Sequence, residues 1–258
     1  MAESTQTYLK AGVGENADTL LLRRWPGAGE PVLYVHGATP LGRAPEAAFQ
    51  IGAVINRIRR ERGGARVHIV AHSWGTIAAG LFAGDHADAV GRLVWFGPFA
   101  RRQIEGLPLP EQIGAWRDVS VADQLKRFIE DVPPGHPHVL IEPELAEWGP
   151  AYLATDPEAS GRSPPAVRIP NGPQADIIAA MSGQLAYQPG RVVAPTLIVR
   201  GAWDNLCRDA DAAWLLNALA SAEKADVVIP AATHLMHLEH GRDGLFAATA
   251  DWLVRRAA

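Results

Sequence analysis

The chain has 258 residues, of which 48% are apolar and 20% are charged, and its formal net charge is −4. This composition is typical of a folded globular domain and excludes an intrinsically disordered chain. The acidic balance argues against a nucleic-acid partner. A single cysteine, Cys207, excludes an internal disulfide and favours a reducing compartment.

The amino-terminal segment, residues 1–20, lacks a basic stretch followed by an apolar one, which is the pattern of a signal peptide. No window approaches the ~18 consecutive apolar residues that a membrane span needs. We therefore expect a cytoplasmic protein with no membrane partner.

Short apolar runs alternate with amphipathic segments along most of the chain. This pattern predicts strands at 5–12, 19–25, 31–37, 66–73, 92–99, 195–204 and 225–230, and helices at 44–62, 74–87, 208–221 and 241–256. Strands that alternate with helices predict an α/β fold, in which a mostly parallel, doubly wound sheet carries helices on both faces.

The segment 100–190 has a different character, because it holds most of the chain's 20 prolines and only short helical patterns, at 119–131 and 174–187. It is too long for an ordinary connecting loop. We expect a helical lid at 100–190, inserted into a core that is made of residues 1–99 and 191–258.

The strongest chemical signal is the stretch VHIVAHSWGTIAAG, in which an apolar strand runs into Ser73 and a helix follows at once. Such a turn exposes a serine Oγ above the sheet, and it tolerates only small residues two positions away, here Ala71 and Gly75. The amide of Trp74 would then face a developing oxyanion at the helix N-terminus. The alternative is a serine that only caps a helix.

These residues resemble the nucleophile turn of the α/β-hydrolase superfamily, and the resemblance covers nearly the whole chain. The family's G-x-S-x-G motif stands here as A-H-S-W-G. The pair His36-Gly37 is similar to the segment that supplies the second oxyanion amide in this family. The resemblance therefore implies that the backbone N–H of Ala38 fills that role, with Thr39 as the neighbouring alternative.

The same resemblance implies a Ser–acid–His triad in that chain order. Asp204 follows the predicted strand at 195–204, in competition with Asp209 and Asp211 of the next helix. The histidine is expected at His234, after the last strand.

His237 and His240 are the alternatives to His234, three and six residues further on. The pairs His234-x-x-His237 and His136-x-His138 lack a matching carboxylate or cysteine cluster, so we expect no metal site. The chain also has no phosphate-binding glycine loop and no dinucleotide fingerprint, so we expect no cofactor.

Aromatic residues fall where a substrate pocket is expected, although each one could equally be ordinary core. With Thr39, the expected pocket residues are Phe96, Phe99, Trp116, Trp148, Tyr187 and Trp203. They indicate a small, mainly apolar substrate.

The resemblance breaks between Gly37 and Ser73, where the interval is about half the family's usual span. One β–helix–β crossover fits there and two do not. We therefore expect a sheet one strand short of the family's eight, with one face poorly covered, which favours a homodimer or a less stable monomer.

The sequence predicts a serine hydrolase that cleaves a carboxylic ester through an acyl-enzyme. Two alternatives remain at this point. The same triad could act on a C–C bond, a thioester or an amide, or the chain could be a non-catalytic ligand-binding relative that the deletion has disabled.

Overall fold

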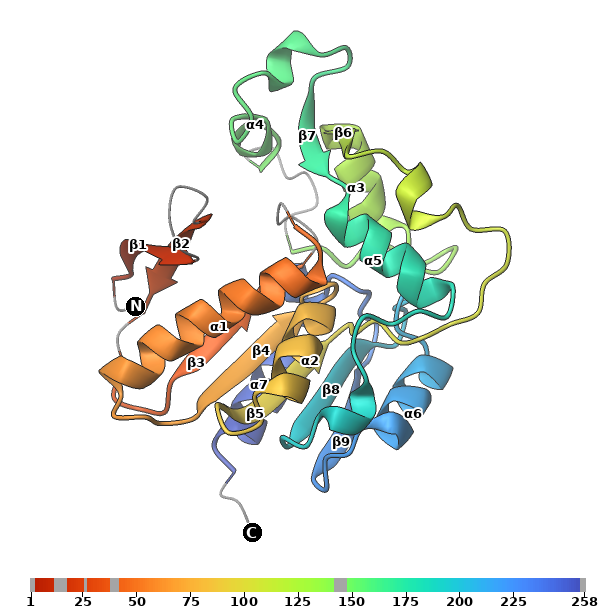
Figure 1. Ribbon diagram of the computed structural model, residues 1–258. Helices are drawn as coiled ribbons and strands as arrows, with labels where there is room; N and C mark the ends of the chain where they lie inside the picture. The colour runs from red at the N-terminus through yellow and green to blue at the C-terminus, as the bar shows by residue number, and fades with distance from the viewer. Residues whose placement is uncertain (1–2, 12–17, 26, 38–41, 142–147, 256–258) are drawn as a thin grey trace.

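A five-stranded parallel sheet forms the centre of the structure, in the order β3–β4–β5–β8–β9 (Figure 1). The computed structural model describes residues 3–11, 18–25, 27–37, 42–141 and 148–255. The sheet strands are β3 (Val32–Val35), β4 (Val67–His72), β5 (Val90–Phe96), β8 (Thr196–Gly201) and β9 (Lys224–Ile229). The three central strands β4, β5 and β8 are mainly apolar, as is typical of parallel strands that are covered on both faces.

Helices cover both faces of this sheet, as Figure 1 shows. On one face lie α1 (Ala44–Glu61), α2 (Gly75–Asp85) and α6 (Asp209–Ala218), whose apolar residues share the main hydrophobic core. On the other face, α7 (Arg242–Leu253) packs with β5, β8 and β9 in a second cluster around Trp252. The predicted α/β fold, with its mostly parallel doubly wound sheet, is confirmed.

An amino-terminal hairpin stands apart from the central sheet. Its strands β1 (Thr5–Ala11) and β2 (Asp18–Arg24) pair only with each other among the described strands. The expected sheet of seven strands is therefore wrong for the described residues, because the separate hairpin leaves five strands in the central sheet. The sequence did not reveal that the hairpin would be separate, because hydrophobic patterns predict strands but not the strands with which they pair.

Strand β3 is therefore the edge of the sheet in the part of the chain that the structure describes. Its Leu33 and Val35 pack against the main core, whereas Val32 and Tyr34 point to the opposite face and are about half exposed, at 47% and 52%. Of the described helices only α7 lies on that face, and it covers the other end of the sheet. The face of the sheet that carries α7 is therefore poorly covered at β3, as expected.

The residues predicted to form the lid lie above the carboxyl ends of the sheet strands (Figure 1). They include α3 (Val121–Ile129), α4 (Trp148–Leu153) and α5 (Gly172–Met181), so the helix predicted at 174–187 ends earlier than expected. Beside these helices, β6 (Trp116–Ser120) and β7 (Ala166–Pro170) form an antiparallel ribbon that the sequence did not predict. Proline at the end of β7 hid the strand pattern.

Short 3₁₀ turns complete the fold, at Pro110–Gln112, Ala159–Gly161, Pro189–Arg191 and Met236–Leu238. None of the helices in the described ranges is long and apolar enough to cross a membrane.

The buried face of α1 gives a stability prediction. Ile55 is fully buried in the main core, whereas Phe49 of the same helix is 59% exposed. Ile55→Ala should lower the free energy of unfolding by about 2–5 kcal/mol because it leaves a cavity. Phe49→Ala should change it by no more than about 0.5 kcal/mol. Denaturant titrations measure both, and equal losses would contradict this packing.

The uncovered face beside β3 keeps the homodimer as a prediction. Light scattering at increasing protein concentration should then give the mass of two chains. A mass of one chain at high concentration, without unusual binding of a hydrophobic dye, would count against it.

Candidate active site

Ser73 lies in a sharp turn between β4 and α2. Its φ of +55° falls in the left-handed region that residues with a side chain rarely adopt. The turn holds because Ser73 N–H donates to the Phe96 carbonyl at 3.1 Å and the Thr76 hydroxyl donates to the Ser73 carbonyl at 2.6 Å. These bonds fix a strained backbone at the end of a buried strand.

Gly75 shows why the turn requires a small residue two positions after the serine. A Cβ on Gly75 would collide with the His36 carbonyl oxygen and would lie 2.9 Å from that of Val35. The end of β3 therefore sits directly against the first turn of α2. Ala71 is fully buried in the main core, so the small residue two positions before the serine is also in a tight place.

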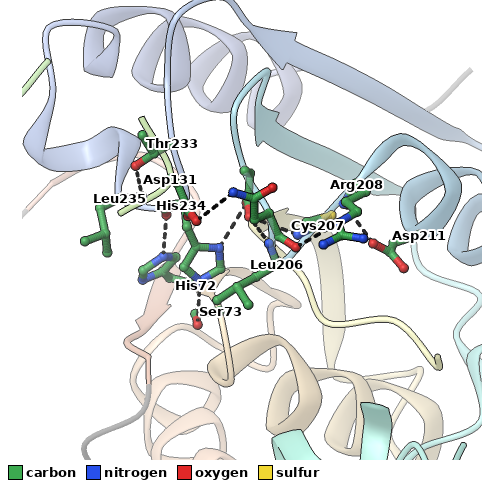
Figure 2. A network of polar contacts seen from close by, with 12 residues as sticks. His72, Ser73, Asp131, Leu206, Cys207, Arg208, Asp211, Thr233, His234 and Leu235 are labelled. Carbon is green, nitrogen blue, oxygen red and sulfur yellow. Dashed lines mark hydrogen bonds and ion pairs between the residues drawn. The ribbon is translucent and has the colours of Figure 1, made fainter. Parts of the chain in front are cut away.

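A continuous hydrogen-bond chain links Ser73 to His234 and Asp204 (Figure 2). His234 Nε2 lies 2.8 Å from Ser73 Oγ, and its Nδ1 lies 3.0 Å from Asp204 Oδ2. The other carboxylate oxygen of Asp204 accepts the amides of Leu206 and Cys207, at 2.8 and 2.9 Å. The structure thus brings together the three residues that the sequence singled out.

The competing candidates lie elsewhere. The carboxylate of Asp209 is exposed and pairs with Arg200, whereas Asp211 pairs with Arg102. His240 is exposed. The His237 ring packs edge-on against the rings of His72 and Phe96. Among the described residues it forms no hydrogen bond with Ser73.

The carboxylate of Asp204 is held ionised. Burial alone would raise its pKa, but the charge of His234, the hydrogen bond from His234 and the two loop amides together outweigh burial. The pKa of Asp204 therefore lies below its ordinary value. An ionised carboxylate at this position fixes the proton of His234 on Nδ1 and leaves Nε2 free to accept one from Ser73.

Gly97, directly after β5, makes room for the histidine and the acid. A Cβ there would lie 2.8 Å from two atoms of the His234 ring and 3.2 Å from Asp204 Oδ2, and its φ is +56°. The sequence analysis did not assign Gly97 a role in the site. The motif F-G-P directly after a strand could have predicted a tight turn at Gly97, where a neighbouring side chain can pack closely.

A second histidine braces the first. His72 is fully buried and its Nε2–H donates to the backbone carbonyl of His234 at 3.1 Å. Its ring stacks on Phe96, with centroids 4.2 Å apart, and meets His237 edge-on at 4.8 Å. Sequence reasoning missed His72, because the position before the nucleophile carries no chemical requirement that a pattern could reveal.

These neighbouring imidazoles remain neutral. Burial lowers the pKa of His72 well below its ordinary value, and the adjacent His234 and His237 lower it further. Burial likewise lowers the pKa of His237 to about 4. A neutral surrounding is useful here because a positive charge beside His234 would oppose the imidazolium that forms when Ser73 is deprotonated.

Glu239 fixes the loop that carries His234. It is completely buried, and its carboxylate accepts the Thr233 backbone N–H at 2.9 Å and contacts the Thr233 hydroxyl. Burial raises the pKa of this carboxyl group, and the hydrogen bonds from Thr233 only partly oppose the shift. Thr233 is thereby held immediately before the histidine.

The oxyanion residues are only partly covered by the structure. Trp74 directly precedes α2, where the positive end of the helix dipole lies, and its side chain is fully buried. Ala38 and Thr39, the expected second donor and its alternative, lie outside the described residues.

The aromatic residues expected to line a pocket fall into three groups. Phe99 lies near the triad, 6.1 Å from the His234 ring, and Trp203 adjoins Asp204 and stacks against His136. Phe96 and Tyr187 are core side chains instead, because Phe96 packs behind His72 and Tyr187 packs on Trp95 and α2.

The lid aromatics differ again. Trp116 is half exposed on the ribbon. Trp148 stacks on Tyr152 and meets Phe128 edge-on inside the lid. Aromatic character alone did not distinguish these positions from a pocket wall.

A cavity of about 550 Å³ borders the loop that carries the acid. Its walls come from lid residues 130–134 and from residues 200–205 and 208–210, and do not include Ser73 or His234. Within the described ranges, no three histidine, cysteine, aspartate or glutamate side chains cluster as metal ligands would.

All three loops of the site are bonded to the lid. Beside Asp204, the Asn205 side chain donates to Asp131 of the lid at 3.1 Å. Near His234, residues 139–141 and 238–240 pair through two backbone bonds of 3.0 and 3.1 Å. Next to Ser73, the Trp74 indole donates to Asp176 of α5 at 3.0 Å.

Comparison with known proteins identifies a family for the chain. A family model described as serine aminopeptidase, S33 matches residues 49–241. No curated protein matches the chain.

Several solved structures share the fold at low sequence identity. A 2-hydroxy-6-oxo-6-phenylhexa-2,4-dienoate hydrolase from Rhodococcus sp. strain RHA1 is 16% identical over 99% of this chain and 100% of that chain, with a TM-score of 0.59. A thermophilic esterase from Thermogutta terrifontis is 16% identical over 98% of both chains, with a TM-score of 0.57. An epoxide hydrolase from Vigna radiata is 13% identical over 97% of this chain and 98% of that chain, with a TM-score of 0.63.

The family match spans well over half of the chain, and the matched region contains Ser73, Asp204 and His234. The chain therefore belongs to the serine aminopeptidase S33 family, within the α/β-hydrolase superfamily.

Proposed function

We propose that the protein hydrolyses a carboxylic ester through a Ser73–His234–Asp204 triad. The observation that carries this proposal is the unbroken hydrogen-bond chain from Asp204 through His234 to the strained Ser73. A buried serine that only capped a helix would need neither a histidine at 2.8 Å nor a carboxylate behind it.

The chemistry follows from the direction of these bonds. Ser73 Oγ attacks the ester carbonyl carbon while its proton passes to His234 Nε2, and a tetrahedral oxyanion forms. The oxyanion collapses, the C–O bond to the alcohol breaks, and the alcohol leaves with the proton from His234. A water molecule, deprotonated by His234, then attacks the acyl-enzyme and releases the acid and free Ser73.

The amides of Trp74 and Ala38 are proposed to bind the oxyanion. Position 74 supports the first of these roles, since an amide at the start of α2 benefits from the positive end of the helix dipole. The second role rests on the resemblance of His36-Gly37-Ala38 to the family's loop.

A mainly apolar substrate is proposed, because Ser73 and His234 are enclosed and the buried ring of Phe99 lies beside the histidine. The description of the matching family favours amides as the second candidate class. The C–C hydrolase among the structural neighbours shares only the fold. The one cysteine, buried Cys207, fits the cytoplasmic location that we propose.

Labelling by a fluorophosphonate tests the nucleophile. The wild-type protein should be labelled and should hydrolyse a short-chain p-nitrophenyl ester. Ser73→Ala should abolish labelling and lower kcat by at least about 10³-fold. Ser182→Ala, at the end of α5, is the control and should leave both measurements unchanged. Absence of labelling in folded wild-type protein would contradict the proposal and favour a non-catalytic, ligand-binding function.

A matched substrate panel tests the bond. Short-chain p-nitrophenyl esters, the corresponding thioesters and aminoacyl p-nitroanilides differ in the atom that leaves. We expect the highest kcat/KM for the esters. A higher value for the anilides would overturn ester specificity while leaving the triad intact.

The pH profile tests the base. An imidazole that already carries a proton on Nε2 cannot accept one from Ser73, so kcat/KM should fall on the acid limb of the profile by tenfold per pH unit. Asp204 should not contribute between about pH 5 and 8, since its pKa is lowered, and His72 and His237 stay neutral there. Initial rates measured across this range should give an acid limb on which log kcat/KM rises with pH with a slope of one. A slope of two would show that a second group titrates with the base.

A further inference from the structure

One lid carboxylate touches the residue that follows the nucleophile and the start of the first helix at the same time. Asp176 of α5 is 3% exposed. Its Oδ2 accepts hydrogen bonds from the Trp74 indole N–H at 3.0 Å and the Ala44 backbone N–H at 2.7 Å. Its Oδ1 accepts one from the Arg43 Nε–H at 2.5 Å. Nothing in the triad chemistry requires this contact.

The three donors come from two segments that the proposed reaction uses. Trp74 is the residue whose amide faces the oxyanion, and its fully buried indole is anchored by Asp176. Ala44 is the first residue of α1 and closes the segment that begins at Gly37. Asp176 therefore fixes Trp74, one of the two proposed oxyanion residues, and the start of α1.

The helix that carries Asp176 is a rigid platform. Ile177 of α5 belongs to the main core, and Asn171, before the helix, donates to the carbonyl of Ile113 at 2.9 Å. The backbone of Gly172 packs so closely on the Gly42 carbonyl that a Cβ would lie 2.5 Å from it. This part of the lid is fastened to the core next to α1.

A buried carboxylate is costly unless hydrogen bonds compensate it. Three donors, one of them charged, provide that compensation here.

We propose that Asp176 is a positioning residue for the oxyanion side of the site. It holds Trp74 and the start of α1 in the arrangement that binds the tetrahedral intermediate, and it leaves the protonation of His234 untouched. This role rests on the proposed function.

Four variants test it: Asp176→Asn, Trp74→Phe, the double variant of these two, and Asp118→Asn as the control. Asp118 is also a lid aspartate in ion pairs, with Arg168 at 2.8 Å and Arg162 at 3.7 Å, and both of these partners lie in the lid. Active sites are counted with fluorophosphonate, so that an unfolded fraction does not enter kcat. Thermal unfolding is recorded for each variant.

Asp176→Asn should lower kcat and the rate of phosphonylation by about 10–100-fold, with KM changed by less than about threefold, because the lost interaction acts in the transition state. The acid limb of the pH profile should not move. Asp118→Asn should stay within about twofold of wild type. The double variant should be no slower than the slower single variant, since both break the same contact.

The role would be overturned if Asp176→Asn kept kcat within twofold per active site, or raised KM alone. Additive losses in the double variant would equally overturn it. If wild-type protein is labelled and Asp176→Asn is unaffected, only this inference fails. If wild-type protein is not labelled at all, the proposed function fails and takes the positioning role with it. Faster hydrogen exchange of the Trp74 indole N–H in Asp176→Asn separately verifies that the contact exists in solution.

Discussion

The strained turn at Ser73 is the constraint on which the rest of the site depends. A left-handed φ at a residue with a side chain persists only where the surroundings fix it. Here the buried strand β4, the carbonyl of Phe96 and the close approach of Gly75 to the end of β3 all act on the same few backbone atoms. This strain is the cost of presenting the Ser73 hydroxyl to His234 at the carboxyl edge of the sheet.

The lid takes part in this arrangement instead of lying loosely above it. It meets the nucleophile turn at Asp176, the acid loop at Asp131 and the histidine loop through residues 139–141. Three loops that are distant in the sequence therefore share one common support. Movement of the whole lid would have to break all three contacts, so substrate access is easier to explain by local displacement of single segments.

Much of the fold could be predicted from the sequence, because buried parallel strands and amphipathic helices have distinct periods. The strands around Ser73, Asp204 and the loop of His234 were placed by this reasoning, and the three side chains do meet. What escaped prediction depends on contacts between distant segments. Gly97, His72 and Asp176 act through neighbours that no local pattern contains.

Among the described residues β3 pairs with a strand on one side only, and this has a consequence for the order in which structure is lost. A four-residue strand with one neighbour opens at lower free energy than a strand paired on both sides, as β4 is. β3 leads into His36 and Gly37, whereas β4 ends at Ser73. Local opening would thus disturb the wall behind Gly75 while the central strands remain folded, and activity would disappear at temperatures where most of the chain is still native.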